Sequence, residues 1–420
     1  MSAGETLRDE AAALDAADPL AGYRECFHLP DGVVYLDGNS LGPLPKASVA
    51  RLEQTVRGEW GTGLIRSWNA CDRGGANWIS APQRVGAKIA PLIGAERHEV
   101  IACDSTSVNI FKLICAALHA RPGRKTILSE PGNFPTDTYM IEGLEAQGLA
   151  TRRLVERDGL EAALRGAGGG DVALLMLTHV HYRTGHLHDM ERLTRAAHEA
   201  GALVLWDLAH TAGAMPVDLN ALGVDYAVGC GYKYLNGGPG APAFAFVAER
   251  HHDTLAQPLT GWMGHREPFA FSDDYAPGKG MDRLLAGTPP ILGLAALEEG
   301  VELIARIGVD RLWTKSRALS RFFLACLDAL GVDLEQVSPS DADQRGSQLS
   351  FRHEDAYAVC QALIARGVIG DFRAPDILRL GFAPAYLRFA DMAAAARALG
   401  EVLESGEWRR PEFAERAAVT

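Results

Sequence analysis

Short apolar segments alternate with helix-length segments between residues 99 and 250, and this alternation constrains the fold more than any other feature of the chain. Strand-length apolar runs separated by helices are typical of βαβ units, which build a mostly parallel sheet buried on both faces. We therefore expect an α/β fold whose ligands bind beyond the carboxyl ends of the strands. The expected strands are 99–102, 126–128, 172–177, 202–206, 226–229 and 243–247, and the expected helices are 107–120, 136–147 and 190–200.

The pattern changes after residue 295, where long amphipathic helices come first and strands and helices then mix. We expect a large α/β domain over residues 61–294 and a smaller α+β domain formed by residues 1–60 and 295–420. In the smaller domain the expected helices are 295–306, 312–330, 357–366 and 392–405, and the expected strands are 347–352 and 377–381.

Charge and cysteine content exclude several classes of protein. The 420 residues contain 41 Lys and Arg against 53 Asp and Glu, a net charge of −12, which disfavours binding to nucleic acid or to an anionic membrane. No apolar run approaches the roughly 18–20 residues of a membrane span, and the first residues lack the pattern of a secretory signal. The seven cysteines, Cys71 among them, are scattered without a C-x-x-C pair. We therefore expect a cytoplasmic protein with reduced thiols and no metal site.

Two polar residues follow neighbouring apolar runs. Asp207 ends the run that begins at Leu203, and Lys233 follows the next run between Gly231 and Gly237. Asp207 alone reads more readily as a helix N-cap, and Lys233 alone could be a solvated loop residue. Together, one crossover apart, they match the carboxylate and the amine that hold the ring nitrogen and the aldehyde of pyridoxal phosphate (PLP).

Two further segments could complete such a site. Thr106 and Ser107 open a helix after an expected strand, where backbone N–H groups can bind a phosphate, although an ordinary N-cap explains them as well. Phe134 and Asp137 follow the next strand. Phe134 could stack on a pyridine ring or pack in the core, and Asp137 could cap a helix or touch the cofactor.

Several blocks of the sequence resemble kynureninase, a PLP enzyme of fold type I, the aspartate-aminotransferase-like fold. The resemblance runs from about residue 20 to 400 and is carried by YLDGNSLG at 35–42, NFPTD at 133–137, WDLAH at 206–210, VDYA at 224–227, GYKYLNGGPG at 231–240 and GWMGH at 261–265.

The resemblance implies a role for each matching residue. Lys233 would bind PLP covalently, Asp207 would pair with the ring nitrogen, and Tyr232 would contact the phosphate and relay a proton. The other cofactor-binding residues implied are Thr106, Ser107, Phe134, Asp137, Thr178 and His210, with Trp262 and Thr288 supplied across a homodimer interface.

For the substrate, the resemblance implies that Arg379 grips the carboxylate, a task that suits a bidentate guanidinium. A surface ion pair is the alternative for Arg379, although it lies inside an apolar run. Trp68, Asn69 and His265 are candidate walls for the aromatic half of the substrate, and loop packing explains these three nearly as well.

The implied reaction is hydrolysis of L-kynurenine, or of its 3-hydroxy form, to anthranilate or 3-hydroxyanthranilate and L-alanine by Cβ–Cγ cleavage, in tryptophan catabolism and pyridine nucleotide biosynthesis. One alternative is a cysteine desulfurase or selenocysteine lyase-like enzyme, of which the desulfurase would need a reactive cysteine on a loop. Another is a non-catalytic PLP-fold binding protein, which predicts loss of Lys233 or Asp207. A nicotinamide dehydrogenase is disfavoured because no G-x-G-x-x-G follows the first strand.

Overall fold

The computed structural model describes residues 3–69, 76–166 and 168–416, so Cys71 lies outside the described residues. The chain divides into two compact units. The first, here called the terminal unit, comprises residues 1–47, 183–187 and 303–420, and the second, the sheet unit, comprises 48–182 and 188–302. Each unit is described by itself.

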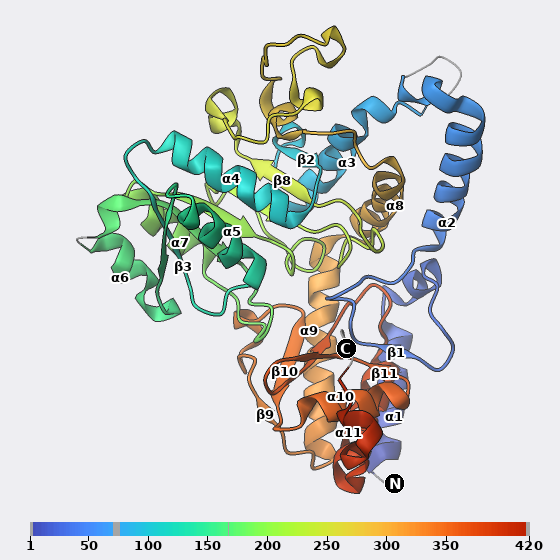
Figure 1. Cartoon of the computed structure of the whole chain (residues 1–420). Helices are drawn as coiled ribbons and strands as arrows, with labels where there is room; N and C mark the ends of the chain where they lie inside the picture. The colour runs from blue at the N-terminus through green and yellow to red at the C-terminus, as the bar shows by residue number, and fades with distance from the viewer. Residues whose placement is uncertain (1–2, 70–75, 167, 417–420) are drawn as a thin grey trace. The chain divides into compact units, whose positions relative to one another are not determined.

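The sheet unit is built on a seven-stranded sheet with the order β2-β8-β7-β6-β5-β3-β4 (Figure 1). Strands β3 to β7 run parallel, and β8 is antiparallel to both of its neighbours. Strands β5 and β6 are buried along their whole length, as expected for apolar strands covered on both faces. The strands are β2 Val100–Ala102, β3 Thr126–Ser129, β4 Thr151–Leu154, β5 Val172–Thr178, β6 Leu203–Asp207, β7 Tyr226–Gly229 and β8 Phe244–Val247.

Helices connect the parallel strands and cover the sheet. Helix α4 contacts β5 and β7 and packs against α5, and its buried Ile110, Leu113 and Ile114 belong to the main hydrophobic core. The helices of the unit are α3 Ala81–Ile89, α4 Thr106–Ala120, α5 Pro135–Ala146, α6 Leu160–Arg165 and α7 Met190–Glu199, and α2 Lys46–Glu53 and α8 Ile291–Ile307 each pass from one unit to the other. The sequence therefore predicted the α/β architecture and its main elements correctly.

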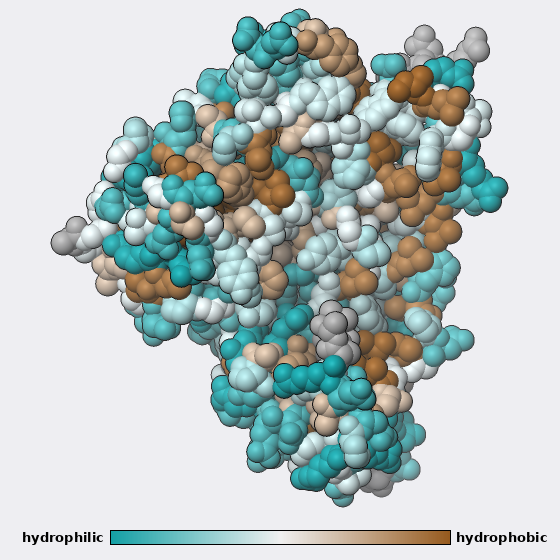
Figure 2. All heavy atoms as spheres, in the orientation of Figure 1, coloured by the Kyte–Doolittle hydropathy of each residue, from teal (hydrophilic) through white to brown (hydrophobic). Residues whose placement is uncertain are grey.

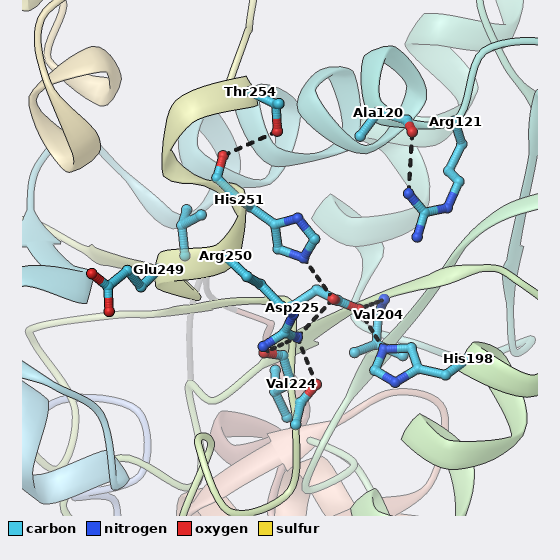
Figure 3. A network of polar contacts seen from close by, with 12 residues as sticks. Ala120, Arg121, His198, Val204, Val224, Asp225, Glu249, Arg250, His251 and Thr254 are labelled. Atoms are coloured by element: carbon cyan, nitrogen blue, oxygen red, sulfur yellow. Dashed lines mark hydrogen bonds and ion pairs between the residues drawn. The ribbon is translucent and has the colours of Figure 1, made fainter.

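A polar cluster ties the amino end of β7 to its neighbours (Figure 3). The buried Asp225 accepts hydrogen bonds from Nε2 of His198 on α7 (2.8 Å), Nε2 of His251 (2.7 Å) and Nη2 of Arg250 (2.7 Å). It also accepts one from the backbone N–H of Val204 in β6 (2.9 Å). One carboxylate thus connects β6, β7, α7 and the segment after β8, at the edge of the sheet opposite to the carboxyl ends of its parallel strands.

The terminal unit contains a four-stranded antiparallel sheet with the order β12-β13-β10-β9 and a two-stranded parallel pair, β1 with β11. Asp371 on β12 lies directly opposite Arg379 on β13 in the register. The strands are β1 Val34–Tyr35, β9 Glu335–Gln336, β10 Gln348–Arg352, β11 Val368–Ile369, β12 Asp371–Arg373 and β13 Ile377–Gly381, and the helices are α1 Ala3–Ala17, α9 Val309–Ala329, α10 Ala356–Ala365, α11 Phe389–Ser405 and α12 Pro411–Ala414.

Many of the exposed apolar side chains of the sheet unit fall in two groups along the chain. Figure 2 shows apolar residues gathered over α2 and the segment that follows it. The first group is Val49, Val56, Trp60, Leu64 and Ile65, and the second is Leu259, Trp262, Phe269, Phe271 and Tyr275. None of the helices in the described part of the chain is both long enough and apolar enough to cross a lipid bilayer.

Candidate active site

The loops after β2, β3, β5, β6 and β7 converge on one cavity at the carboxyl edge of the sheet. Because carboxyl ends of neighbouring parallel strands share one sheet edge, residues far apart in sequence meet there. The residues that line the cavity are Ser105, Thr106, Ser107, Phe134, Thr136, Thr178, Tyr182, Asp207, Ala209, His210, Tyr232 and Lys233.

Lys233 and Asp207 both lie in this cavity and both are buried. The Lys233 Nζ lies 5.7 Å from the centre of the Phe134 ring and 5.9 Å from the centre of the Tyr232 ring. Gly231 permits the tight path of the chain before the lysine, since a Cβ at this position would lie 2.3 Å from the carbonyl oxygen of Pro242. The turn therefore places an amine against an aromatic wall.

Asp207 and Asp137 are two buried carboxyl groups, and the charge of Lys233 acts on both of them. Burial raises the pKa of Asp207, and the nearby Lys233 opposes that rise. Burial and the charge of Asp207 raise the pKa of Asp137 well above its ordinary value. Asp137 accepts a hydrogen bond from Thr178 Oγ1 at its Oδ2 (3.2 Å), while its buried Oδ1 has no hydrogen-bond partner among the described residues. Two carboxyl groups face one amine, so the site can accept one further positive charge.

Asn133 fixes the loop that carries Phe134 and Asp137. Its Oδ1 accepts hydrogen bonds from the backbone N–H of Phe134 (2.8 Å) and from Thr178 Oγ1, and its Nδ2 donates to Ser129 Oγ (3.2 Å). Tyr182 packs edge-to-face on Phe134, with ring centres 5.1 Å apart. The two rings form one aromatic wall of the cavity.

The amino end of α4 forms another wall. Ser105 caps the helix by accepting a hydrogen bond from the N–H of Val108, and Ser107 Oγ lies 2.7 Å from Thr136 Oγ1. The first N–H groups of a helix have no partner within the helix and attract anions. This wall suits a phosphate group.

Three features of the cavity match the chemical groups of PLP. It has a helix amino end with hydroxyl side chains for the phosphate, aromatic rings for a planar heterocycle, and a buried acidic pair for a protonated ring nitrogen. Lys233 supplies the amine that PLP binds covalently.

The structure brings most of the expected cofactor residues together. Thr106, Ser107, Phe134, Thr178, Asp207, His210, Tyr232 and Lys233 all line the cavity. Asp137 does not line the cavity itself but accepts a hydrogen bond from Thr178, which does. The sequence analysis missed Ser105, Thr136, Tyr182 and Ala209. Ser105, Thr136 and Ala209 lie shortly after expected strands or within the block that contains Phe134, and this position was the signal that could have found them. No such signal marks Tyr182.

The remaining expected residues lie elsewhere in the described chain. Trp262 and Thr288 are exposed and do not line this cavity. Trp68 packs edge-to-face on Trp78 with ring centres 5.8 Å apart, Asn69 is exposed, and His265 packs on Tyr275 at 5.9 Å. Such contacts occur in loop packing, and the three residues stay predicted walls for the aromatic half of the substrate.

Arg379 belongs to the terminal unit, where its side chain is 1% exposed. Its Nε donates to Asp371 Oδ1 (2.8 Å), and its Nη2 donates to Asp371 Oδ2 and to Ser40 Oγ (2.7 Å). An ion pair therefore exists, but the alternative of a surface pair is wrong because both partners are buried.

Five of the six described thiols do not have the environment of a cysteine nucleophile. Burial raises the pKa of Cys103 to about 12 and those of Cys115 and Cys326 to about 11, and it also raises the pKa values of Cys230 and Cys360. Reactive cysteines have a lowered pKa instead.

Comparisons with known proteins agree with the sequence resemblance. Residues 312–399 match the family model for the kynureninase C-terminal domain. A kynureninase of Burkholderia mallei is 51% identical over 98% of this chain and 99% of its own length. A kynureninase of Pseudomonas fluorescens is 46% identical over 99% of this chain and 100% of its own length.

Solved structures show the same fold. A cysteine desulfurase of Thermococcus onnurineus has a TM-score of 0.77 at 20% identity and covers 91% of this chain and 98% of its own. A C-DES variant with glycine covalently linked to its PLP cofactor has a TM-score of 0.76 at 17% identity, covering 90% of this chain and 98% of its own. At these identities the likeness shows the fold alone, that of fold type I PLP-dependent enzymes. Full-length identity near one half decides the family: the chain belongs to the kynureninase family.

Proposed function

We propose that this chain is a PLP-dependent hydrolase that converts L-kynurenine and water to anthranilate and L-alanine by cleaving the Cβ–Cγ bond. The proposal rests above all on one observation: Lys233 and Asp207 line the same cavity as the amino end of α4. The similarity to kynureninases over the full chain supports it. The same chemistry on the 3-hydroxy substrate would give 3-hydroxyanthranilate, and both reactions fit tryptophan catabolism and pyridine nucleotide biosynthesis.

Each cavity residue has a task in this reaction. PLP, when bound, withdraws electrons from the substrate Cα, which activates a bond one carbon further along. Lys233 would hold the cofactor through its Nζ and, with that amine free, would move the Cα proton of the substrate as a general base. Asp207 would hold the ring nitrogen in its protonated form, and Tyr232 would relay a proton from its hydroxyl. Water adds to the γ-carbonyl before the Cβ–Cγ bond breaks.

We assign the substrate α-carboxylate to Arg379. Its guanidinium can offer a planar fork, and a buried arginine binds a carboxylate more strongly than an exposed one because water competes less. Trp68, Asn69 and His265 remain proposed walls for the aromatic half of the substrate.

We also propose a homodimer in which Trp262 and Thr288 complete the cofactor site of the partner chain. Trp262 is 44% exposed and belongs to a group of exposed apolar residues, a feature that marks interaction surfaces. Covering an indole exposed in this way with a second chain lowers the free energy, because apolar surface is removed from water.

A cytoplasmic location is proposed on the state of the thiols. All six described cysteines are free, and four of them are buried. Reduced, buried thiols are typical of proteins that work in a reducing compartment.

A turnover assay tests the proposed reaction. Purified protein loaded with PLP is mixed with L-kynurenine or its 3-hydroxy form, and anthranilate fluorescence or 3-hydroxyanthranilate absorbance is recorded. We expect turnover of at least one of them, and a visible absorption band from the covalently bound cofactor. Lys233→Ala should abolish both the band and the turnover. An unchanged band in that variant, or no product from wild-type protein, would contradict the proposal.

A further inference from the structure

The contacts of Arg379 are organised around one carboxylate. Asp371 lies opposite Arg379 on the neighbouring antiparallel strand, and its two oxygens accept hydrogen bonds from Nε and Nη2 of the same guanidinium. Both side chains are 1% exposed. Two parallel hydrogen bonds to one carboxylate fix the plane of a guanidinium as well as its position.

Ser40 and Arg373 hold the carboxylate of Asp371 in turn. Ser40, on the loop after β1, donates from its Oγ to Asp371 Oδ2 (2.8 Å) and accepts from Nη2 of Arg379 (2.7 Å). Arg373 donates from Nη2 to the same Asp371 oxygen (2.6 Å). Although burial alone raises the pKa of Asp371, the charges and hydrogen bonds of Arg379 and Arg373 hold it below its ordinary value. Asp371 is therefore an ionised anchor between two cations.

Stability alone explains this arrangement poorly. Arg379 lies in a strand whose other residues, among them Ile377, Leu378 and Leu380, are buried and apolar. Replacing a buried ion pair by well-packed apolar residues is often neutral or stabilising, because two charges no longer lose their hydration. A fork held in one plane, by contrast, can meet an incoming carboxylate without first losing rotamer freedom.

We propose that Asp371 is a positioning residue for Arg379, which it holds in the orientation that receives the α-carboxylate of the substrate. The inference rests on the proposed function, since it needs Arg379 to bind that carboxylate. Ser40 supports the same orientation through its hydrogen bonds with both members of the pair.

The test compares two inhibitors that differ by one carboxylate. 3-Benzoylpropionate has the aryl ketone and the carboxylate of the substrate but no amine, and propiophenone is its decarboxylated counterpart. Inhibition constants for both are measured against kynurenine turnover by the PLP-loaded enzyme. For Asp371→Asn we expect the constant for 3-benzoylpropionate to rise about tenfold or more, and that for propiophenone to change less than about twofold. The KM for kynurenine should rise more than kcat falls.

Asp391→Asn is the matched control. Asp391 is a buried carboxylate of the same unit, and it pairs with Arg24 (3.1 Å) and Arg388 (2.8 Å). Its loss should lower the melting temperature while leaving the ratio of the two inhibition constants at the wild-type value. If Asp371→Asn behaves in the same way, Asp371 is merely structural and the inference is wrong.

Two milder variants cover the case in which Asp371→Asn does not fold. Asp371→Glu keeps a carboxylate and should retain part of the preference for 3-benzoylpropionate. Ser40→Ala should lower that preference by about threefold, because the hydrogen bonds of the Ser40 hydroxyl with Asp371 and Arg379 are lost. A wild-type ratio in both variants overturns the inference. Failure of the proposed function looks different: the wild-type enzyme would not turn over kynurenine, or Arg379→Lys would leave the binding of 3-benzoylpropionate unchanged.

Discussion

Two neighbouring carboxyl groups of the terminal unit have pKa values shifted in opposite directions, because only one of them is paired with arginines. Asp371 has two arginine partners, and its pKa lies below the ordinary value. Burial and the charge of Asp371 raise the pKa of Asp37 to about 7, and the buried Oδ1 of Asp37 lacks a hydrogen-bond partner in the described part of the chain. The folded protein therefore holds a proton on Asp37 that the unfolded chain has already released at pH 5.

This difference predicts how stability changes with pH. A raised carboxyl pKa stabilises the folded state at low pH, and that contribution is lost as the pH rises from about 4 to about 7. Asp37→Asn removes the titration, so its stability relative to wild type should increase by about 2–3 kcal/mol between pH 5 and pH 8. Urea unfolding at both pH values measures it, with the exposed Asp31→Asn as control. An equal change in both variants would assign the effect to another group.

At the residue scale, the sequence predicted the parts of the site that strand ends determine. Asp207 and Lys233 follow apolar runs, and the carboxyl ends of such runs meet at one edge. Tyr182 could not be chosen in this way because it lies four residues beyond β5, in a loop whose path no periodicity records. Asp371 was missed because β12 is a strand of three residues with two charged ends.

At the element scale, Asp225 fixes β7 in the sheet and so fixes the strand that leads to Lys233. Although burial alone raises its pKa, hydrogen bonds from His198, His251 and Arg250 hold the pKa of Asp225 well below the ordinary value. A depressed carboxyl pKa stabilises the folded state above the unfolded pKa near 4, and this contribution is lost as the pH falls below it.

Asp225→Asn should therefore destabilise the protein by about 3 kcal/mol at pH 7, the size expected when one member of a buried charged group is removed. Thermal or urea unfolding measures the loss, and the difference from wild type should narrow as the pH falls through about 4. Asp253→Asn, an exposed neighbour, is the control and should change stability by less than about 0.5 kcal/mol. A loss of that small size in Asp225→Asn would show that the cluster of Figure 3 does not stabilise the sheet.

Strands with two buried faces were predicted well, and the solvent-facing edge strand β4 was not. The expected strand 226–229 coincides with β7, and 172–177 differs from β5 by one residue. Strand β4, Thr151–Leu154, was missed because it lies at the sheet edge and its residues are exposed or half-buried, so its sequence has no apolar run. A strand that is buried on both faces consists of a continuous apolar run, and such a run can be recognised in the sequence.

At the scale of the whole molecule, the cofactor cavity of one chain contains Lys233 and Asp207 but neither Trp262 nor Thr288. If the proposed homodimer is correct, each site combines Lys233 of one chain with Trp262 of the other. In a mixed dimer of a Lys233 variant and a Trp262 variant, both mutations would then fall in one of the two sites. The other site would contain the natural Lys233 and the natural Trp262.

This arrangement predicts that two impaired variants restore each other. Lys233→Ala and Trp262→Ala, unfolded together and refolded as a mixture with PLP, should form mixed dimers in which one site has both residues intact. Random pairing makes half of the dimers mixed, so about a quarter of wild-type activity should return in closed two-fold dimers. Lys233→Ala mixed with Asp207→Asn is the matched control, because both residues belong to the same cavity and no mixed dimer contains an intact site. Equal activity in the two mixtures would show that Trp262 does not contribute to the partner's site. Sedimentation of the wild-type protein at the mass of a single chain would show that it is not a dimer.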